Sequence, residues 1–327
     1  MNEPAANTRR DFLLRATKAG LAIAAVGTAG VMLHDRKGPS ANALAETVSV
    51  PDFSIAGVGR RLSIITGSDR LKTLNRALQA LGGIEQFIKR GDRVVLKVNA
   101  AFASPASLGA TSHPDLVREV VKLCLGAGAA VVSVTDNPIN DPESCFALSG
   151  IAKAAESAGA RVILPNAAAF RPTTLTGGRL IKEWPLLYEP LLGATKLIGI
   201  APIKDHHRSG ASMTMKNWYG LLGGRRNVFH QDIHTIISEL ARMVRPTLVI
   251  LDGTNTMMTN GPTGGSFEDL KATHTMIAST DQVAADAFGA TLLGKTAADL
   301  PFIVKAAAAG VGTADYESLK PRRDHVE

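Results

Sequence analysis

Short apolar runs of strand length alternate with helical stretches along most of this chain, and this alternation limits the fold more than any other feature. The strand-like runs are mostly bounded by turn residues and stand at 61–67, 93–99, 130–136, 161–165, 195–204, 247–253 and 274–280. One helical stretch opens at His113-Pro114 and closes at Gly126. Such alternation calls for parallel strands joined by right-handed crossovers. The sequence therefore predicts an α/β fold with a mostly parallel sheet and helices on both faces.

Residues 166–192 break this rhythm. Gly177-Gly178 stands between two short apolar runs, which predicts a small hairpin insertion at about 170–190. The rhythm then resumes without an internal repeat, and the last dozen residues are expected to fray. For a chain of 327 residues, we expect a single α/β domain over 46–327 behind a separate leader at 1–45.

The first 45 residues have the layout of a secretory leader, with a basic start and then an apolar run over 19–33 that is rich in Ala and Gly. Residues 8–13 (TRRDFL) resemble the twin-arginine export signal, although the lysine that often follows this motif is absent. Small residues at Ala43 and Ala45 predict cleavage after Ala45.

This leader predicts a protein that is exported by the twin-arginine translocation machinery, its transport partner, and that works in the periplasm or otherwise outside the cytoplasmic membrane. An uncleaved membrane anchor is the alternative reading. The apolar run of about fifteen residues is short against the roughly 20 that a bilayer span needs. We therefore expect no stable membrane span after cleavage.

The charge balance argues against a nucleic-acid partner. The whole chain has a formal charge of +7, but residues 1–45 carry six basic and three acidic residues, which leaves 30 basic and 26 acidic residues beyond them. Aromatic residues make up only 5%. A nucleic-acid interface needs clustered Lys and Arg with aromatic residues among them, and the sequence shows no such cluster.

The chain has two cysteines, Cys124 and Cys145. An oxidising compartment permits a disulfide between them, but Cys124 stands in an apolar helical stretch, where a buried free thiol is the more common state. Two thiolates are too few for an iron–sulfur cluster, which normally takes four. The sequence therefore excludes a self-contained iron–sulfur cluster and leaves the identity of any other cofactor unknown.

Polar side chains follow several of the predicted strands. In an open α/β sheet the ligand crevice lies beyond the carboxyl ends of the strands, so we expect one common rim formed by Lys97, Asn99, Asp136, Lys204, His206 and Asp252. Asp136 and Asp252 are the candidate catalytic bases or metal ligands, and His206 is the candidate proton carrier. Helix capping and turn formation are the alternative roles for Asp and Asn here.

The segment 204–220 (KDHHRSGASMTMKNWYG) gathers cations between small residues. We expect Lys216 and Asn217 to lie on a short helix that is capped by Ser212 or Thr214. The amino end of this helix would offer free N–H groups to a small anionic ligand. A solvated basic loop is the alternative. Trp218 and its neighbour are expected to pack this helix against the sheet.

A Gly-rich stretch at 260–265 (NGPTGG) follows a strand, as phosphate loops do. Asn260, Gly261 and Gly264 are therefore candidate ligand-binding residues. The stretch lacks the lysine of a P-loop and the spacing of a dinucleotide fingerprint. A plain turn cluster, with glycine at positive φ, explains it equally well.

A divalent metal is the rival ligand. His230 and His234 are four residues apart, so on a helix they share one face. With Asp136, Asp252 or one of the two adjacent histidines at 206–207 they would form a nitrogen–oxygen site. Surface or capping histidines are the alternative, and His113 is expected to be structural.

Six blocks of this sequence resemble, in order, the domain-of-unknown-function family numbered 362: VVLKVN, HPDLVREVV, VTDNP, KDHHRSGASMTMKNWYGLL, LVILDGTNTMMTNGPTGG and STDQVAADAFGATLLG. The likeness spans about 60–295. The family has no established activity. Some members carry an appended cysteine-rich, ferredoxin-like segment, which implies redox connections, but this chain lacks that segment. The shared blocks contain Lys97, Asn99, His113, Asp136, Lys204, His206, Lys216, Asn217, Asp252, Asn260, Gly261, Pro262 and Gly264.

Two functions follow from these features. The first is an exported enzyme, redox-linked if the family resemblance extends that far, that acts on an anionic ligand or holds a metal at the strand ends. The alternative is a non-catalytic periplasmic binding protein for an anionic small molecule or a metal. A conventional serine hydrolase is disfavoured, because the sequence has no Gly-x-Ser-x-Gly motif.

Overall fold

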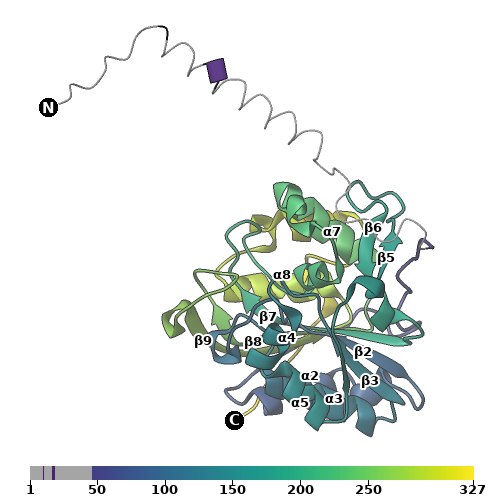
Figure 1. The fold of residues 1–327 in the computed structure, drawn as a ribbon. Coiled ribbons are helices and arrows are strands. Elements are labelled where there is room, and N and C mark those ends of the chain that lie inside the picture. Colours follow the sequence, from purple (N-terminus) through teal and green to yellow (C-terminus); the bar gives the residue numbers. More distant parts are fainter. Residues whose placement is uncertain (1–9, 11–16, 19–45) are drawn as a thin grey trace, which may run out of the picture. The chain divides into compact units, whose positions relative to one another are not determined.

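The computed structural model describes residue 10, residues 17–18 and residues 46–327 (Figure 1). The cleavage site after Ala45 and the twin-arginine motif, apart from Arg10, lie outside the described residues. The chain divides into two compact units, Met1–Pro39 and Ser40–Glu327, and the sheet and its helices belong to the second. No helix within the described ranges is long and apolar enough to span a bilayer.

The domain is built on an eight-stranded sheet with the order β10-β1-β9-β8-β7-β2-β3-β4. The strands are β1 (Leu62–Thr66), β2 (Arg93–Lys97), β3 (Val131–Thr135), β4 (Arg161–Ile163), β7 (Lys196–Lys204), β8 (Leu248–Met257), β9 (Leu270–Ser279) and β10 (Arg322–His325). All neighbouring pairs are parallel except those of β9, which runs antiparallel to both β1 and β8. The predicted mostly parallel α/β sheet is confirmed.

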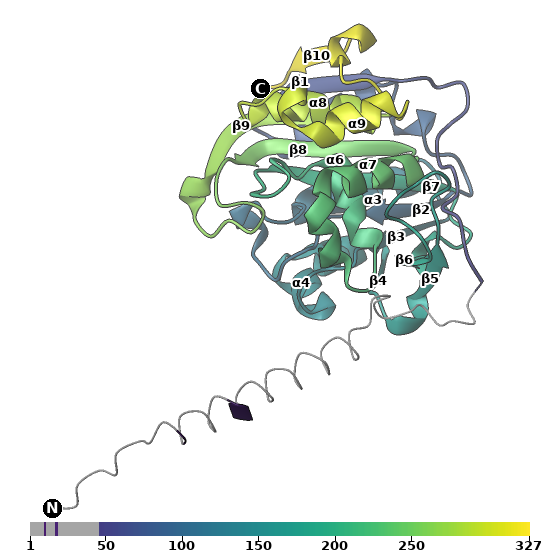
Figure 2. The same cartoon turned by 90° about the horizontal axis from the view of Figure 1, so that it is seen from above.

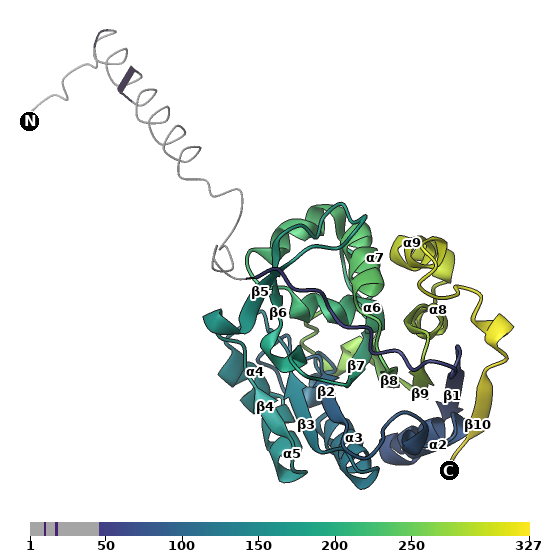
Figure 3. The ribbon, with the colours of Figure 1, turned by 90° about the vertical axis from the view of Figure 1, so that its right-hand side faces the viewer.

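Helices cover both faces of this sheet (Figure 3). One face carries α2 (Arg70–Ala80), α3 (Pro114–Gly126) and α5 (Ile151–Ser157), and the other carries α6 (Thr214–Asn217), α7 (Ile233–Met243), α8 (Gln282–Leu292) and α9 (Pro301–Ala308). A further helix, α4 (Pro142–Leu148), precedes α5. Viewed from above, α6 and α7 lie nearer β7, while α8 and α9 lie toward β8, β9 and β1 (Figure 2).

Strand alternation divides the core between these two layers. Even-numbered residues of the central strands, such as Ile198 and Ile250, pack with α2 and α3. Odd-numbered residues, such as Leu197 and Leu251, pack with α7 and α8. Successive side chains of a strand point to opposite faces. A polar residue at the end of a strand therefore reaches only one of the two layers, and its face depends on its position in the strand.

Two peripheral elements complete the domain. The predicted hairpin insertion is confirmed as β5 (Phe170–Thr173) paired antiparallel with β6 (Trp184–Leu187). The expectation of a frayed C-terminus is wrong, because β10 pairs in parallel with β1 over four residues. The sequence Arg-Arg-Asp-His has no apolar signal, and all four residues are exposed. Backbone pairing at the sheet edge orders this segment without apolar burial.

Candidate functional site

Lys97 and Asp136 meet at the carboxyl ends of the neighbouring strands β2 and β3. Lys97 Nζ lies 2.7 Å from Asp136 Oδ1, and the two side chains are 1% and 3% exposed. Burial lowers the pKa of Lys97, while the negative charge of Asp136 acts in the opposite direction. The sequence predicted this proximity correctly, because parallel neighbouring strands end at the same edge.

This ion pair is closed to solvent. Asp136 also accepts hydrogen bonds from Ala100 N (2.7 Å) and Asn137 N (2.9 Å). Gly220 packs directly over the pair: a Cβ at this position would overlap the Asp136 carboxylate and lie 2.8 Å from Lys97 Nζ. Asp136 therefore joins three segments of chain as a structural group, and its predicted role as a catalytic base gains no support from this geometry.

Asn217 has a structural position as well. Its Oδ1 accepts a hydrogen bond from Lys97 Nζ (3.0 Å), and its Nδ2 donates to Lys97 O and Ile200 O (both 3.2 Å). The side chain thus connects α6 to β2 and β7, and its amide groups are bonded within the protein. These internal bonds give no support to the expected ligand-binding role of Asn217, and they fix the position of the residue before it, Lys216.

The amino end of α6 is not free, which corrects the expectation of an open N–H cradle. Asp286 of α8 accepts hydrogen bonds from Thr214 N (2.8 Å), Thr214 Oγ1 (2.5 Å) and Met215 N (3.0 Å). Burial raises the pKa of Asp286 to about 7. A carboxylate from another helix therefore occupies the position that the sequence assigned to a cap by Ser212 or Thr214 and to an anionic ligand.

Lys204 and Lys216 lie beyond the sealed pair and have few partners. Lys204 Nζ donates to Ala110 O (2.6 Å) and lies 5.3 Å from the centre of the Phe102 ring. Lys216 is partly exposed, and its Nζ lies 5.3 Å from the centre of the Tyr219 ring. None of the described residues forms a hydrogen bond or ion pair with the Lys216 ammonium group.

Burial and neighbouring positive charges lower the pKa of both of these lysines. Burial, reinforced by the positive charge of Lys216, lowers the pKa of Lys204 to about 7. Burial and the positive charge of Arg226 lower the pKa of Lys216 to about 7. A lysine in this state is readily deprotonated near neutral pH, and an added anion would favour its charged form.

Arg226 is a part of the site that the sequence analysis missed. Its guanidinium donates to Asn137 O (2.7 Å) and Pro138 O (2.8 Å), and also to the carbonyls of Tyr219 and Leu222. Its pKa is lowered by burial. Arg226 stands in the stretch GGRRN, which matches no recognised motif, and only its contacts show its role.

These four cations form one group, which we call the cation cluster: Lys97, Lys204, Lys216 and Arg226. Within the described residues, the negative charge of Asp136 works to raise the pKa of Lys97, Lys204 and Arg226. No carboxylate of these residues has this effect on the pKa of Lys216. With every group charged, four positive charges would face one negative charge in a largely buried volume.

Three histidines flank the cluster. His206 stacks on His207 with ring centres 5.0 Å apart and on His230 with ring centres 6.1 Å apart. Burial, and then the positive charge of Lys216, lowers the pKa of His206 to about 2. Its ring accepts backbone hydrogen bonds from Arg208 and Ser209. His206 is therefore neutral near pH 7, and this environment gives no support to its expected role as a proton carrier.

Asp252 does not reach this cluster, contrary to the expectation of one common rim. It follows Ile250 on the face covered by α2 and α3, where its Oδ2 lies 2.8 Å from Arg70 Nε. Lys97 follows Val95 on the opposite face, that of α6 and α7. The prediction placed both residues at strand ends correctly but did not account for the alternation of side chains along each strand.

The loop 260–265 is held by internal contacts. Asn260 Nδ2 donates to Asp269 Oδ1 (2.6 Å). A Cβ on Gly261 would overlap the Asp205 backbone, and Gly264 has φ +58° beside Met257. These contacts agree with the alternative of a plain turn cluster and do not support a phosphate loop. Asn99 differs, because its Oδ1 is buried and has no hydrogen-bond partner in the described residues.

The structure separates the two histidines of the proposed metal pair. The helix α7 begins at Ile233, so His230 lies before it in a 3-10 helix at Arg226–Asp232 and contacts Tyr219. His234 stacks on Phe302 instead. In the part of the chain that is described, no three His, Cys, Asp or Glu side chains are grouped to hold a metal ion.

The two cysteines are both free and buried. Burial raises the pKa of Cys124 to about 12. Burial also raises the pKa of Cys145, the thiol of α4. The sequence left open whether the two cysteines form a disulfide or stay as free thiols, and the structure contains two buried free thiols.

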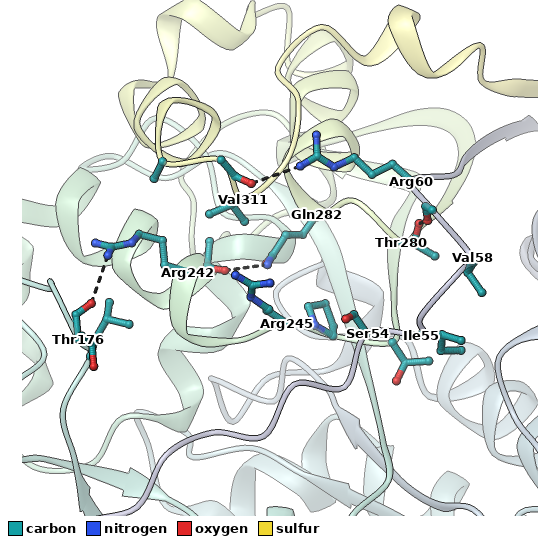
Figure 4. Close-up of a pocket in the computed structure, with 17 residues that line it drawn as sticks. Ser54, Ile55, Val58, Arg60, Thr176, Arg242, Arg245, Thr280, Gln282 and Val311 are labelled. Atoms are coloured by element: carbon teal, nitrogen blue, oxygen red, sulfur yellow. Dashed lines mark hydrogen bonds between the residues drawn. The ribbon is translucent and has the colours of Figure 1, made fainter.

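A cavity of about 560 Å³ lies at the other end of the sheet, beside the residues that lead into β8. Arg60, Arg242 and Arg245 line it together with Gln282 (Figure 4). All three arginines already have partners, which are Asp281 for Arg60, the carbonyl of Thr176 for Arg242 and Asp52 for Arg245. Carboxylates thus balance the charges of Arg60 and Arg245, whereas Arg242 is bonded, among the described residues, only to backbone carbonyls.

Comparison with known proteins places these features in a family context. The family model described as "Domain of unknown function (DUF362)" matches residues 94–291, more than half of the chain. A thylakoid-associated protein of Synechocystis sp. is 26% identical over 229 residues, which cover 66% of this chain and 67% of that protein.

Two solved structures were also found. The lactate racemase apoprotein from Thermoanaerobacterium thermosaccharolyticum has 12% identity and a TM-score of 0.37, with 72% of this chain and 57% of that chain covered. A Thermotoga maritima protein has 13% identity and a TM-score of 0.33, with 57% and 51% covered. This chain thus spans little more than half the length of either structure.

Proposed function

The chain belongs to the DUF362 family, whose description names no activity, and from its site we propose that it is an exported enzyme that binds a small carboxylate or phosphate anion at the cation cluster. The observation that carries this proposal is the unpaired ammonium group of Lys216, with Lys204 and Arg226 as its charged neighbours. A buried or half-buried cation is stable only with an anionic partner or after losing its proton.

Catalysis, as opposed to simple binding, is supported by the pKa of about 7 of Lys216. Proton transfer is most effective when the pKa of the catalytic group is near the working pH. Lys216 is partly exposed, so a ligand can reach it, whereas Lys97 and Lys204 are each 1% exposed. We therefore assign proton transfer to Lys216 and charge complementarity to the rest of the cluster.

Inorganic phosphate is expected to raise the melting temperature of the mature protein by about 5 °C at saturation. The effect should be full below pH 7 and should decline above it, because Lys216 binds an anion only in its protonated form and its pKa is about 7. Thermal melts between pH 5.5 and 9 measure this. Lys216→Met should abolish the stabilisation, while Lys182→Met, a change at an exposed lysine, should leave it intact.

Retention of the full phosphate effect in Lys216→Met would remove this residue from the site and contradict the proposal. The anions that stabilise the protein can also be used to test whether it is an enzyme or a non-catalytic binding protein. When each stabilising carboxylate that carries a C–H next to its carboxyl group is incubated with the protein in D2O, proton NMR detects exchange of that proton if Lys216 removes it. Unchanged spectra at full occupancy would leave the non-catalytic binding protein as the function.

Export by the twin-arginine pathway is the second part of the proposal, and it is supported by residues 8–13 of the sequence. The double change Arg9→Lys with Arg10→Lys should leave a full-length precursor in the cytoplasm, because the pathway reads the arginine pair. Cell fractionation with immunoblotting measures this. A matched control is Arg36→Lys with Lys37→Arg, which should export normally. Equal export of both variants would exclude the pathway.

A further inference from the structure

A separate cavity of about 470 Å³ lies on the opposite face of the sheet, at the carboxyl ends of β7 and β8. Pro202 of β7 and Asp252 of β8 form one wall, and Arg70 and His113, at the starts of α2 and α3, form another. In open α/β sheets this edge is where ligands bind, and the volume falls in the range of small-molecule sites.

The first indication of a ligand is the guanidinium of Arg70. Its Nε is paired with Asp252 Oδ2 at 2.8 Å, and Asp252 Oδ1 accepts from Thr254 N at 2.9 Å. The two terminal nitrogens of Arg70 have no acceptor among the described residues. Arg70 and Asp252 are only 18% and 7% exposed. The charges of Arg70 and Asp252 balance each other, while the two terminal nitrogens of Arg70 remain available as a bidentate hydrogen-bond donor.

The second indication is independent of charge. Thr111 lines the same cavity and is 2% exposed, and its Oγ1 has no hydrogen-bond partner within the described chain. Buried hydroxyl groups in native structures are almost always hydrogen-bonded, and leaving one unpaired is unfavourable. The Oγ1 atom has almost no accessible surface in this conformation, but a turn of the Thr111 side chain breaks no internal hydrogen bond and would present the hydroxyl to a group bound in the cavity.

His113 adds a third polar group with a defined state. Its Nδ1 accepts a hydrogen bond from Asp115 N at 3.3 Å, so in the neutral ring the proton is on Nε2. Burial, and then the positive charge of Arg70, lowers the pKa of His113 to about 4. Near pH 7 the residue is therefore a neutral ring, and its hydrogen-bond donor is Nε2–H.

The remaining wall is apolar. Phe267 is 68% exposed although it is a large hydrophobic side chain, and Leu270 lies beside it at the cavity. The cavity thus combines a donor edge, made by Arg70, the His113 ring and the Thr111 hydroxyl, with an exposed aromatic surface. Donors of this kind suit a carboxylate group, and the aromatic surface suits an apolar substituent.

We propose that this cavity is a second ligand site, distinct from the cation cluster, which takes a small organic carboxylate with an apolar or aromatic substituent. The carboxylate would lie against Arg70 and Thr111, and the substituent against Phe267. This site does not depend on the proposed function, because its residues lie on the other face of the sheet and share no side chain with the cluster.

Phenylacetate is a suitable probe, and titration calorimetry on the mature protein at pH 7 measures its binding directly. We expect saturable 1:1 binding that Thr111→Val weakens about fivefold, which corresponds to one hydrogen bond. Valine keeps the shape of threonine, and Thr111 Oγ1 bonds nothing internally, so the variant should fold normally. Thr263→Val, at an exposed threonine that does not line the cavity, should bind like the wild type.

Lys216→Met distinguishes the two sites. It should leave phenylacetate binding unchanged while removing the phosphate response, so each proposal can fail without the other. Absence of phenylacetate binding at millimolar concentration would overturn the second site. Binding that is unchanged in Thr111→Val, or lost in Lys216→Met, would overturn it as well, because the ligand would then be at the cation cluster or elsewhere.

Discussion

Asp136→Ala is expected to lower the free energy of unfolding by about 3–5 kcal/mol, the range for breaking a buried ion pair from one side. The change leaves Lys97 without its counter-ion in a volume closed by Gly220, and it leaves Ala100 N and Asn137 N without their acceptor. Urea denaturation followed by circular dichroism measures the loss. Glu268→Ala, at an exposed carboxylate, is the matched control and should change stability by less than about 0.5 kcal/mol.

A change at Lys97, the other partner of this ion pair, tests the same geometry more sharply. Lys97→Met should cost less than Asp136→Ala, because the carboxylate keeps its two backbone donors while methionine fills the space of the lysine stem. If the two variants are equally stable, or if Asp136→Ala costs less than about 1 kcal/mol, the sealed pair does not contribute as its burial indicates.

Asp286→Ala is expected to lower the free energy of unfolding by about 3 kcal/mol, since it removes the acceptor of three hydrogen bonds at the start of α6. The phosphate response should disappear with it, although every lysine remains, because α6 positions Lys216. Urea denaturation and thermal melts with phosphate measure both effects. A variant with normal stability and a normal phosphate response would show that α6 needs no support from α8.

Asp286→Asn isolates the titration of this group. The folded-state pKa of about 7 lies above the usual 3.8, so between these values the folded protein holds a proton that the unfolded chain has lost. The part of the stability that depends on protonation of Asp286 is therefore fully present below about pH 4 and is lost as the pH rises to 7, while the hydrogen bonds from Thr214 and Met215 are a separate contribution. Relative to Asp286→Asn, the wild type should lose stability across this window. A pH-independent difference would contradict the raised pKa.

The sequence predicted the layers of this domain well because strand and helix signals depend on local periodicity. The stretch at 93–99 is apolar and β-branched, and it forms the central strand β2. β10 could not be found in this way, because Arg322–His325 carries no apolar residue and is ordered by backbone pairing with β1 and by polar contacts such as that of Asp324 with Arg76. Order that comes from pairing partners is not visible in a short sequence window.

The site was predicted in part for a similar reason. The proximity of Lys97 and Asp136 followed from parallel neighbours, but the position of Asp252 required knowing which face its side chain takes. The capping of α6 by Asp286 joins residues that are 72 positions apart. The sequence of the helix that contains Asp286 has no feature that predicts this contact. Arg226 was missed because four backbone carbonyls define its role, and carbonyls leave no residue signature.

The attachment of α6 to α8 also sets the order in which the protein can be completed during synthesis. Gln282 accepts a hydrogen bond from Trp218 Nε1 (2.6 Å), and Asp286 lies four residues further along the same helix. A growing chain that has released residues 214–218 from the ribosome lacks these contacts until 282–286 have also emerged, and has only those of Asn217 with β2 and β7. The segment that carries Lys216 therefore gains its full set of contacts only when most of the chain has been made.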